Sequence, residues 1–213
     1  MSLQVNAIIF DLDNCLLDPR ELGEAFVEPV FSAIRASNLG TLNETQLLAA
    51  FEDLWQRPFD TVADEHGFSA TMRAAGCRAY ATLEVTAKLH GYGDLVVLNE
   101  LKAVKFLVSS GYRRLQRSKI EALGFKELFA EIHIDAIGEA NRPGKEGLFA
   151  QIARRWRFAP RQVMIVGDNG ESEIAAGNRL KMPTVQLLRP RVTQVLNADF
   201  HIDDLWQLKV LLD

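Results

Sequence analysis

The stretch Val5-Asn6-Ala7-Ile8-Ile9-Phe10-Asp11-Leu12-Asp13 joins a short apolar run to two aspartates. A continuous apolar run of this length predicts a strand that is buried on both faces, from Val5 to Phe10. Similar runs recur along the chain, at Val104–Val108, Ile132–Ile134, Val163–Val166 and Thr184–Leu188. Amphipathic helical patterns separate them, at Tyr112–Leu123, Lys145–Trp156 and Ser172–Leu180. Strands that alternate with helices predict an α/β fold with a Rossmann-like parallel sheet core.

The region between the first two predicted strands has a different pattern. From about Asp18 to His90, apolar residues recur at helical spacing, and no segment has the pattern of a strand. A helical block placed after one strand of a sheet indicates an inserted helical cap domain. We therefore predict a core of residues 1–17 and 92–213 and a cap of residues 18–91. Gly91-Tyr92-Gly93-Asp94 has the composition of a hinge at the second crossing.

The composition excludes several classes of protein. The chain has 213 residues, of which 48% are hydrophobic, and a net charge of −4, which gives no electrostatic footprint for nucleic acid or an anionic membrane. Cys15 and Cys77 lack the spacing of metal ligands. No apolar run approaches the ~20 residues that span a bilayer, and the first residues lack a signal-peptide pattern. We predict a cytoplasmic protein without nucleic-acid or membrane partners. The sequence does not predict an oligomeric state.

Acidic and small polar residues follow the predicted strands. Ligands of parallel α/β sheets bind at the carboxyl ends of the strands, so these side chains should lie close together: Asp11, Asp13, Ser109, Asp168 and Glu173. Two carboxylates ~4 Å apart repel by about 4 kcal/mol at an effective dielectric near 20. Such a cluster needs protons or a cation, and its hard oxygen ligands favour Mg²⁺.

Four ordered motifs resemble those of the haloacid dehalogenase-like (HAD) hydrolase superfamily. Phe10-Asp11-Leu12-Asp13-Asn14 resembles its motif I, and Leu107-Val108-Ser109-Ser110-Gly111 resembles its motif II. Val166-Gly167-Asp168, followed by Glu173, resembles motif IV. Motif III, a lysine before a helix, is expected in between, where Arg142-Pro143-Gly144-Lys145 stands. The resemblance spans residues 5 to about 188, and the helical insert resembles the C1-type cap of the superfamily.

The resemblance implies a phosphatase with an aspartyl-phosphate intermediate. Asp11 would be the nucleophile that attacks phosphorus. Asp13 would protonate the leaving alcohol and then activate water. Ser109 would donate a hydrogen bond to a phosphoryl oxygen, and Lys145 would offset the charge of Asp11 and the phosphoryl group.

The same resemblance implies a Mg²⁺ site at Asp11, Asp13, Asp168 and Glu173. Asp13 would contribute its backbone carbonyl and Asp168 its carboxylate, whereas Glu173 would either support the other ligands without touching the ion or bind it through a water. From the residues alone, Glu173 and Lys145 have a second interpretation. Each could be an ordinary solvent-exposed residue in the first turn of a helix.

Two positions depart from the motifs of the superfamily. Cys15 stands where threonine is usual, which we interpret as a change in packing. In motif III the lysine is commonly followed by proline, and here Arg142 precedes Pro143. We favour Lys145 over Arg142 as the motif III cation because Lys145 should open the helix, whereas a residue before proline is held extended.

We therefore expect a Mg²⁺-dependent phosphomonoester hydrolase that acts on a small phosphorylated metabolite. Within the superfamily, Asp13 argues against dehalogenation and phosphonate cleavage, and a closing cap favours small substrates. Cap residues that could face the substrate include Trp55, Arg57, Arg73 and Arg78. Two alternatives are a phosphorylatable receiver-like signalling module and a catalytically silent binding protein on this scaffold. A receiver domain is shorter and lacks the helical insert, and intact Asp11, Asp13 and Asp168 argue against a silent protein.

Overall fold

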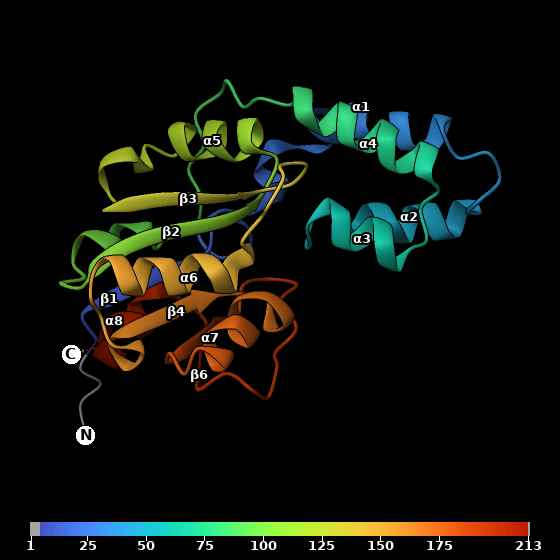
Figure 1. The fold of residues 1–213 in the computed structure, drawn as a ribbon. Helices are drawn as coiled ribbons and strands as arrows, with labels where there is room; N and C mark the ends of the chain where they lie inside the picture. The colour runs from blue at the N-terminus through green and yellow to red at the C-terminus, as the bar shows by residue number, and fades with distance from the viewer. Residues whose placement is uncertain (1–4, 213) are drawn as a thin grey trace.

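The fold, a computed structural model that describes residues 5–212, has a parallel sheet with helices on both faces and a helical lobe beside it (Figure 1). The sheet has six strands in the order β3-β2-β1-β4-β5-β6, and every neighbouring pair is parallel. The strands are β1 (Ala7–Phe10), β2 (Val104–Gly111), β3 (Glu131–Ala136), β4 (Val163–Gly167), β5 (Thr184–Leu187) and β6 (Phe200–Ile202). The predicted α/β class with a Rossmann-like sheet is confirmed. The sequence analysis missed β6, which has only three residues and contains His201.

Alternate residues of β1 pack against helices on opposite faces of the sheet. Ile8 and Phe10 belong to an apolar cluster with α5 (Arg113–Ala122), α8 (Leu205–Leu212) and the 3₁₀ helix η2 (Leu95–Asn99). Ala7 and Ile9 belong to another, with α6 (Gly144–Arg155) and α7 (Ala175–Arg179). Both faces are covered, which explains why β1 is apolar at every position.

The helical lobe has an apolar core of its own. It contains α1 (Glu24–Ala36), α2 (Glu44–Asp53), α3 (Phe59–Glu65) and α4 (Ala70–Thr82). Their inward faces form one cluster in which the ring of Phe31 stacks on that of Phe51, with 4.4 Å between centroids. Helix α4 ends at Thr82, so the segment from Leu83 to Asp94 is irregular, and the helical interpretation was wrong for its last residues. Among residues 5–212, no helix is both long and apolar enough to cross a bilayer.

The two chain crossings between the lobe and the sheet are joined to each other. The carboxylate of Glu21, in the 3₁₀ helix η1 (Pro19–Leu22), accepts hydrogen bonds from the backbone N–H groups of His90 (2.7 Å) and Gly91 (2.9 Å). The N–H of Tyr92 also donates to the carbonyl oxygen of Leu16 (3.1 Å). These bonds lie at the predicted crossings, while the exact cap boundaries, residues 18 and 91, stay a prediction.

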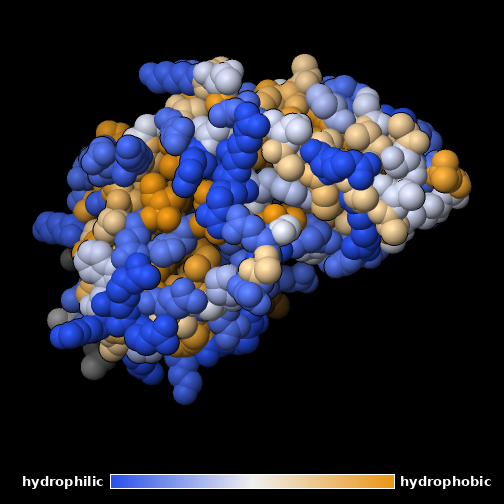
Figure 2. Space-filling model, turned by 45° about the horizontal axis from the view of Figure 1, so that its top comes forward, coloured by the Kyte–Doolittle hydropathy of each residue, from blue (hydrophilic) through white to orange (hydrophobic). Residues whose placement is uncertain are grey.

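The lobe contacts the core over the carboxyl edge of the sheet. The ring of Tyr80 on α4 stacks on that of Tyr112, with 5.1 Å between centroids and 4° between planes. Arg142, in the loop before α6, forms ion pairs with Asp60 on α3 and with Asp135 on β3. The outer surface is mostly hydrophilic on the face that Figure 2 shows, with apolar side chains in smaller separate areas. The lobe therefore covers the end of the sheet where the predicted site residues lie.

A buried ion pair holds the loop after β1 in place. The guanidinium of Arg189 donates to both carboxylate oxygens of Asp94, each at 2.8 Å, and its Nε donates to the carbonyl oxygen of Cys15 (3.0 Å). Asp94 also accepts the backbone N–H of Leu205 (2.8 Å), and Arg189 lies 4.1 Å from the centroid of the Tyr92 ring. One charge pair thus links the motif I loop, the second crossing and α8.

Replacing Arg189 with methionine should lower the free energy of unfolding by about 3–5 kcal/mol, because the variant leaves Asp94 as an uncompensated buried charge. Urea unfolding followed by circular dichroism measures the loss. Arg191→Met is the matched control, since Arg191 pairs at the surface with Asp18 (2.8 Å) and should lose less than about 1 kcal/mol. Equal losses in the two variants would contradict this account of the loop.

Candidate active site

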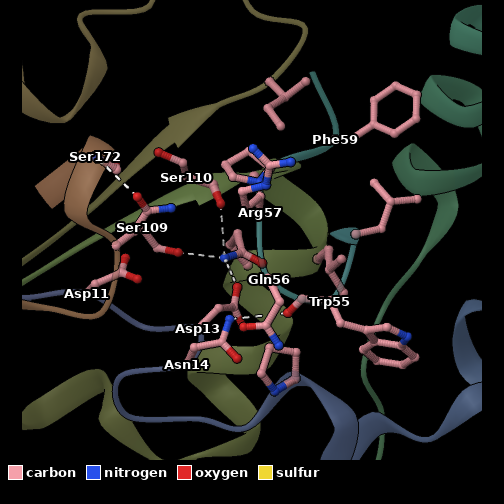
Figure 3. Close-up of a pocket in the computed structure, with 18 of the residues that line it drawn as sticks. Asp11, Asp13, Asn14, Trp55, Gln56, Arg57, Phe59, Ser109, Ser110 and Ser172 are labelled. Carbon is pink, nitrogen blue, oxygen red and sulfur yellow. Dashed lines mark hydrogen bonds between the residues drawn. The ribbon is translucent and has the colours of Figure 1, made fainter. Parts of the chain in front are cut away.

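One pocket at the carboxyl edge of the sheet brings the predicted site residues together. It has a volume of about 110 Å³ and lies between the sheet and the helical lobe (Figure 3). All six predicted site residues line it: Asp11, Asp13, Ser109, Lys145, Asp168 and Glu173. The sheet register explains this, because Phe10 pairs with both Leu107 and Val166, so the residues that follow these three positions lie side by side at the same level of the sheet.

Asp11 and Lys145 form a buried ion pair at the centre of the pocket. The Nζ atom of Lys145 lies 2.6 Å from Oδ1 of Asp11 and also contacts the carboxylate of Glu173. Burial opposes the charged form of Lys145, but the attraction of the two carboxylates outweighs it and raises the pKa of the lysine above its ordinary value. Lys145, the second residue of α6, is therefore not a solvated helix residue.

Arg142, the alternative motif III cation, points elsewhere. Besides Asp60, it contacts Asp135, with Nη2 2.6 Å and Nε 3.3 Å from the carboxylate oxygens. Asp135 also accepts the backbone N–H of Gly144 (3.2 Å) and so fixes the start of α6. Arg142 lies at the contact between the sheet and the helical lobe, while Lys145 lies against Asp11. This geometry favours the predicted choice of Lys145, and its catalytic role stays a prediction.

Three carboxylates converge beside Lys145. Oxygen atoms of Asp11, Asp168 and Glu173 lie within 4.8 Å of one another, and all three residues are buried. Glu173 lies in a π-helical turn, Gly170–Ile174, rather than in the regular helix predicted from Ser172, and it accepts the N–H of Asn169 (3.0 Å). Gly167 makes the approach of Glu173 possible, since a Cβ atom there would lie 2.6 Å from Cγ of Glu173.

The electrostatics of this cluster fit a divalent cation. Burial raises the pKa of Asp11 to about 7, against the lowering effect of Lys145 and with further increase from Glu173. Burial, together with the charges of Glu173 and Asp11, raises the pKa of Asp168 well above its ordinary value. Three carboxylates face one ammonium group, which leaves an excess of two negative charges when all are ionised. Hard oxygen donors with this charge suit Mg²⁺.

The carboxylate of Asp13 lies outside this cluster and faces α5. Nζ of Lys119 lies 2.8 and 3.0 Å from its two oxygens, and Nε2 of Gln116 donates to Oδ2 (2.8 Å). The same Gln116 amide donates to Oγ of Ser109 (2.5 Å) (Figure 3). Ser109 lies within β2, because that strand continues to Gly111 by pairing with β3, whereas the sequence analysis placed it after the strand. Asp13 and Ser109 thus share one partner.

The sequence analysis missed Gln116 and Lys119. Both lie on the buried face of α5 with Leu115 and Ile120. Polar residues at core-facing positions of an amphipathic helix are rarely buried without a partner, and this was the available signal. The partner, Asp13, is distant in sequence and could not be identified from the helix alone.

Cys15 occupies the interior of the motif I loop. It is fully buried, and its thiol donates a weak hydrogen bond to the carbonyl oxygen of Val166 (3.7 Å). Burial raises the pKa of the thiol well above its ordinary value. The residue thus packs between the loop and β4, as a small buried side chain would.

The helical lobe contributes the outer wall of the pocket. Its segment from Leu54 to Phe59 lines the cavity, with Trp55 and Arg57 among the residues that the sequence analysis named as candidates. Arg57 is held by Asp53 (2.9 Å) and Glu65 (2.5 Å). Another candidate, Arg73, donates instead within the cap, to Asp64 and to the carbonyl oxygens of Ala63 and Phe68.

Comparisons with known proteins give one family model and one curated relative that match most of this chain. The sequence model described as haloacid dehalogenase-like hydrolase matches residues 5–181. A curated protein, glyceraldehyde 3-phosphate phosphatase of Methanopyrus kandleri, is 27% identical over 199 residues, which cover 87% of this chain and 84% of that protein.

Two solved structures have the same fold over nearly the whole chain. The HAD-hydrolase YfnB from Bacillus subtilis, bound to magnesium, has a TM-score of 0.67 and 16% identity, with 99% of each chain covered. A HAD phosphatase from Thermococcus onnurineus has a TM-score of 0.65 and 20% identity, with 98% of each chain covered. At these identities the likeness shows the fold alone.

Replacing Asp168 with asparagine should raise the melting temperature of the metal-free protein, and more so at pH 8 than at pH 5. The pKa values of Asp11 and Asp168 are raised in the folded protein, so their stabilising contribution is present at low pH. The part that comes from Asp11 is lost as the pH rises through about 7, the pKa of that carboxyl group, and ionised Asp11 then lies beside Asp168 and Glu173. Thermal unfolding in EDTA at both pH values measures the effect.

The same measurement with millimolar MgCl₂ tests the cation site. The wild type should melt at a higher temperature with Mg²⁺, because a ligand that binds only the folded state stabilises it, and Asp168→Asn should lose most of this shift. Asp203→Asn, at an exposed position, is the control and should keep it. A wild type that does not respond to Mg²⁺ would contradict the metal assignment.

Proposed function

The chain belongs to the haloacid dehalogenase-like hydrolase family, and on that premise we propose that it is a phosphatase that hydrolyses small phosphomonoesters through Asp11. The observation that carries the proposal is the position of Asp11, a buried carboxylate at the end of β1. Lys145 contacts it directly, and two further carboxylates lie within 4.8 Å. The phosphatase activity named for the Methanopyrus kandleri relative supports the same reaction.

In the first half of the proposed reaction, a carboxylate oxygen of Asp11 attacks phosphorus. The new bond joins this oxygen to phosphorus while the bond from phosphorus to the substrate's alcohol oxygen breaks. Asp13 gives its carboxyl proton to the departing oxygen, so that a neutral alcohol leaves. The hydroxyl of Ser109 donates a hydrogen bond to a phosphoryl oxygen. The ammonium group of Lys145 balances the negative charge that develops on the phosphoryl oxygens.

In the second half, water attacks phosphorus in the aspartyl-phosphate. Asp13, now a carboxylate, takes a proton from this water, and the bond between phosphorus and Asp11 breaks. The products are inorganic phosphate and the original Asp11 carboxylate. Each cycle therefore converts one phosphomonoester and one water into an alcohol and phosphate.

The proposed Mg²⁺ ligands are the carboxylates of Asp11 and Asp168, the backbone carbonyl of Asp13, and Glu173 through a water. When bound, the ion would supply positive charge that offsets these carboxylates and the phosphoryl oxygens. Asp168 contributes its carboxylate at the end of β4, and the contact between Glu173 and Lys145 holds both side chains beside it.

The proposed substrate is a small phosphorylated metabolite. The pocket of about 110 Å³ is covered by the cap, which disfavours macromolecules. Glyceraldehyde 3-phosphate, the substrate named for the curated relative, is the first compound to test. We further propose that residues 18–91 form the cap and that the protein acts in the cytoplasm.

Replacing Asp11 with asparagine should abolish turnover without unfolding the protein, because the amide keeps the shape of the side chain and is not a nucleophile. Phosphate release from p-nitrophenyl phosphate and from glyceraldehyde 3-phosphate measures the activity, with Mg²⁺ and with EDTA. EDTA should inactivate the wild type on both substrates. Near wild-type turnover by Asp11→Asn would disprove the aspartyl-phosphate mechanism.

The variants Lys145→Ala and Arg142→Ala should separate the two motif III candidates. Loss of one positioned contact to the transition state typically costs about 10²–10³-fold in kcat, which we expect for Lys145→Ala. Arg142→Ala should be far milder, because Arg142 contacts Asp60 and Asp135 rather than Asp11. Steady-state kinetics on one substrate decide between them. If Arg142→Ala loses most of its activity while Lys145→Ala stays active, Arg142 and not Lys145 is the motif III cation.

A further inference from the structure

We infer that Lys119, together with Gln116, positions Asp13 for its proton transfer to the leaving group. This inference rests on the proposed phosphatase function and adds two residues to it. Both side chains come from α5, and neither contacts the three-carboxylate cluster in the part of the chain that the structure describes. They are positioning residues, because they act through Asp13 and Ser109.

The burial of Lys119 indicates a dedicated partner. Its side chain is 6% exposed, and an ammonium group removed from water is strongly destabilising unless a counter-charge compensates it. The carboxylate of Asp13 supplies that charge, with both oxygens within 3.0 Å of Nζ. Contact with both oxygens fixes the rotation of the carboxylate as well as its place.

Gln116 links the acid to the phosphoryl-binding serine. It lies three residues before Lys119 and hence on the same face of α5. Its amide donates to Oδ2 of Asp13 and to Oγ of Ser109, which sets the distance between the two groups. Gly111 leaves room for this contact, since a Cβ atom there would lie 2.9 Å from Cγ of Gln116.

The position of Lys119 also keeps Asp13 apart from the metal cluster. Asp11, Asp168 and Glu173 attract cations, and a free carboxylate of Asp13 would be an additional ligand for any ion bound there. Lys119 holds that carboxylate on the α5 side of the pocket. The Asp13 carboxylate is thereby held beside Ser109 rather than among the three carboxylates.

The test compares two substrates that differ in their need for an acid. The leaving group of p-nitrophenyl phosphate departs as a stable phenolate, whereas glycerol 3-phosphate must release a protonated alcohol. For Lys119→Met we expect kcat/KM to fall by about 10²-fold on glycerol 3-phosphate and by less than about 10-fold on p-nitrophenyl phosphate. We use kcat/KM because it reports the steps up to alcohol release and excludes the later attack of water.

Two further variants separate positioning from a general structural role. Asp13→Asn should show the same selective loss, and adding Lys119→Met to it should cause no further selective loss, because Lys119 acts through Asp13. Arg117→Met removes an exposed positive charge from the same helix and should leave both substrates unaffected. Lys119→Gln serves as a second variant if circular dichroism shows that Lys119→Met does not fold.

Equal losses on both substrates, no loss, or fully additive effects in the double variant would overturn the inference while leaving the phosphatase function intact. A wild type that hydrolyses neither substrate nor glyceraldehyde 3-phosphate would overturn the proposed function, and the inference with it. The selective loss in Lys119→Met and its absence in the Asp13→Asn background are the supporting results.

Discussion

The mutual repulsion of three buried carboxylates is the constraint on which the site depends. Asp11, Asp168 and Glu173 lie within 4.8 Å of one another, and a pair of such charges ~4 Å apart costs about 4 kcal/mol at an effective dielectric near 20. The adjacent strands β1 and β4 bring Asp11 and Asp168 together because both strands end at the same edge of the sheet. The apolar packing of those strands therefore offsets the repulsion that the site requires.

The cations around the pocket are divided among separate tasks. Lys145 neutralises part of the carboxylate cluster, whereas Lys119 pairs with Asp13 alone among the residues described. Arg142 joins the helical lobe to β3, and Arg189 holds the loop that follows Asp11. Because each cation is held by its own acid, the loss of one leaves the pairing of the others in place. This separation explains how acids with different proposed roles lie in one small pocket.

The sequence predicted the parts of the fold that depend on local pattern. Runs of three to six mostly apolar residues identified five of the strands, because strands buried on both faces carry few polar residues. The sequence analysis missed strand β6, and helix α4 ends at Thr82, earlier than the apolar spacing indicated. The sequence analysis did not predict the pairing of Lys119 with Asp13, because only the folded structure brings these two residues together. The stacking of Tyr80 on Tyr112 across the pocket escaped for the same reason.

The bonds between the two crossings bear on how this architecture can be modified. Glu21 binds the backbone at His90 and Gly91, and Leu16 binds Tyr92, so the lobe leaves and re-enters the core at almost one point. Closing the chain there without the lobe would need only a short connection, whose entropic cost grows slowly with its length. The helical lobe can therefore be replaced as one unit, without changing the order of the strands in the sheet. A lineage or an engineer can replace it to change which molecules reach Asp11 while the sheet and its buried charges are inherited unaltered.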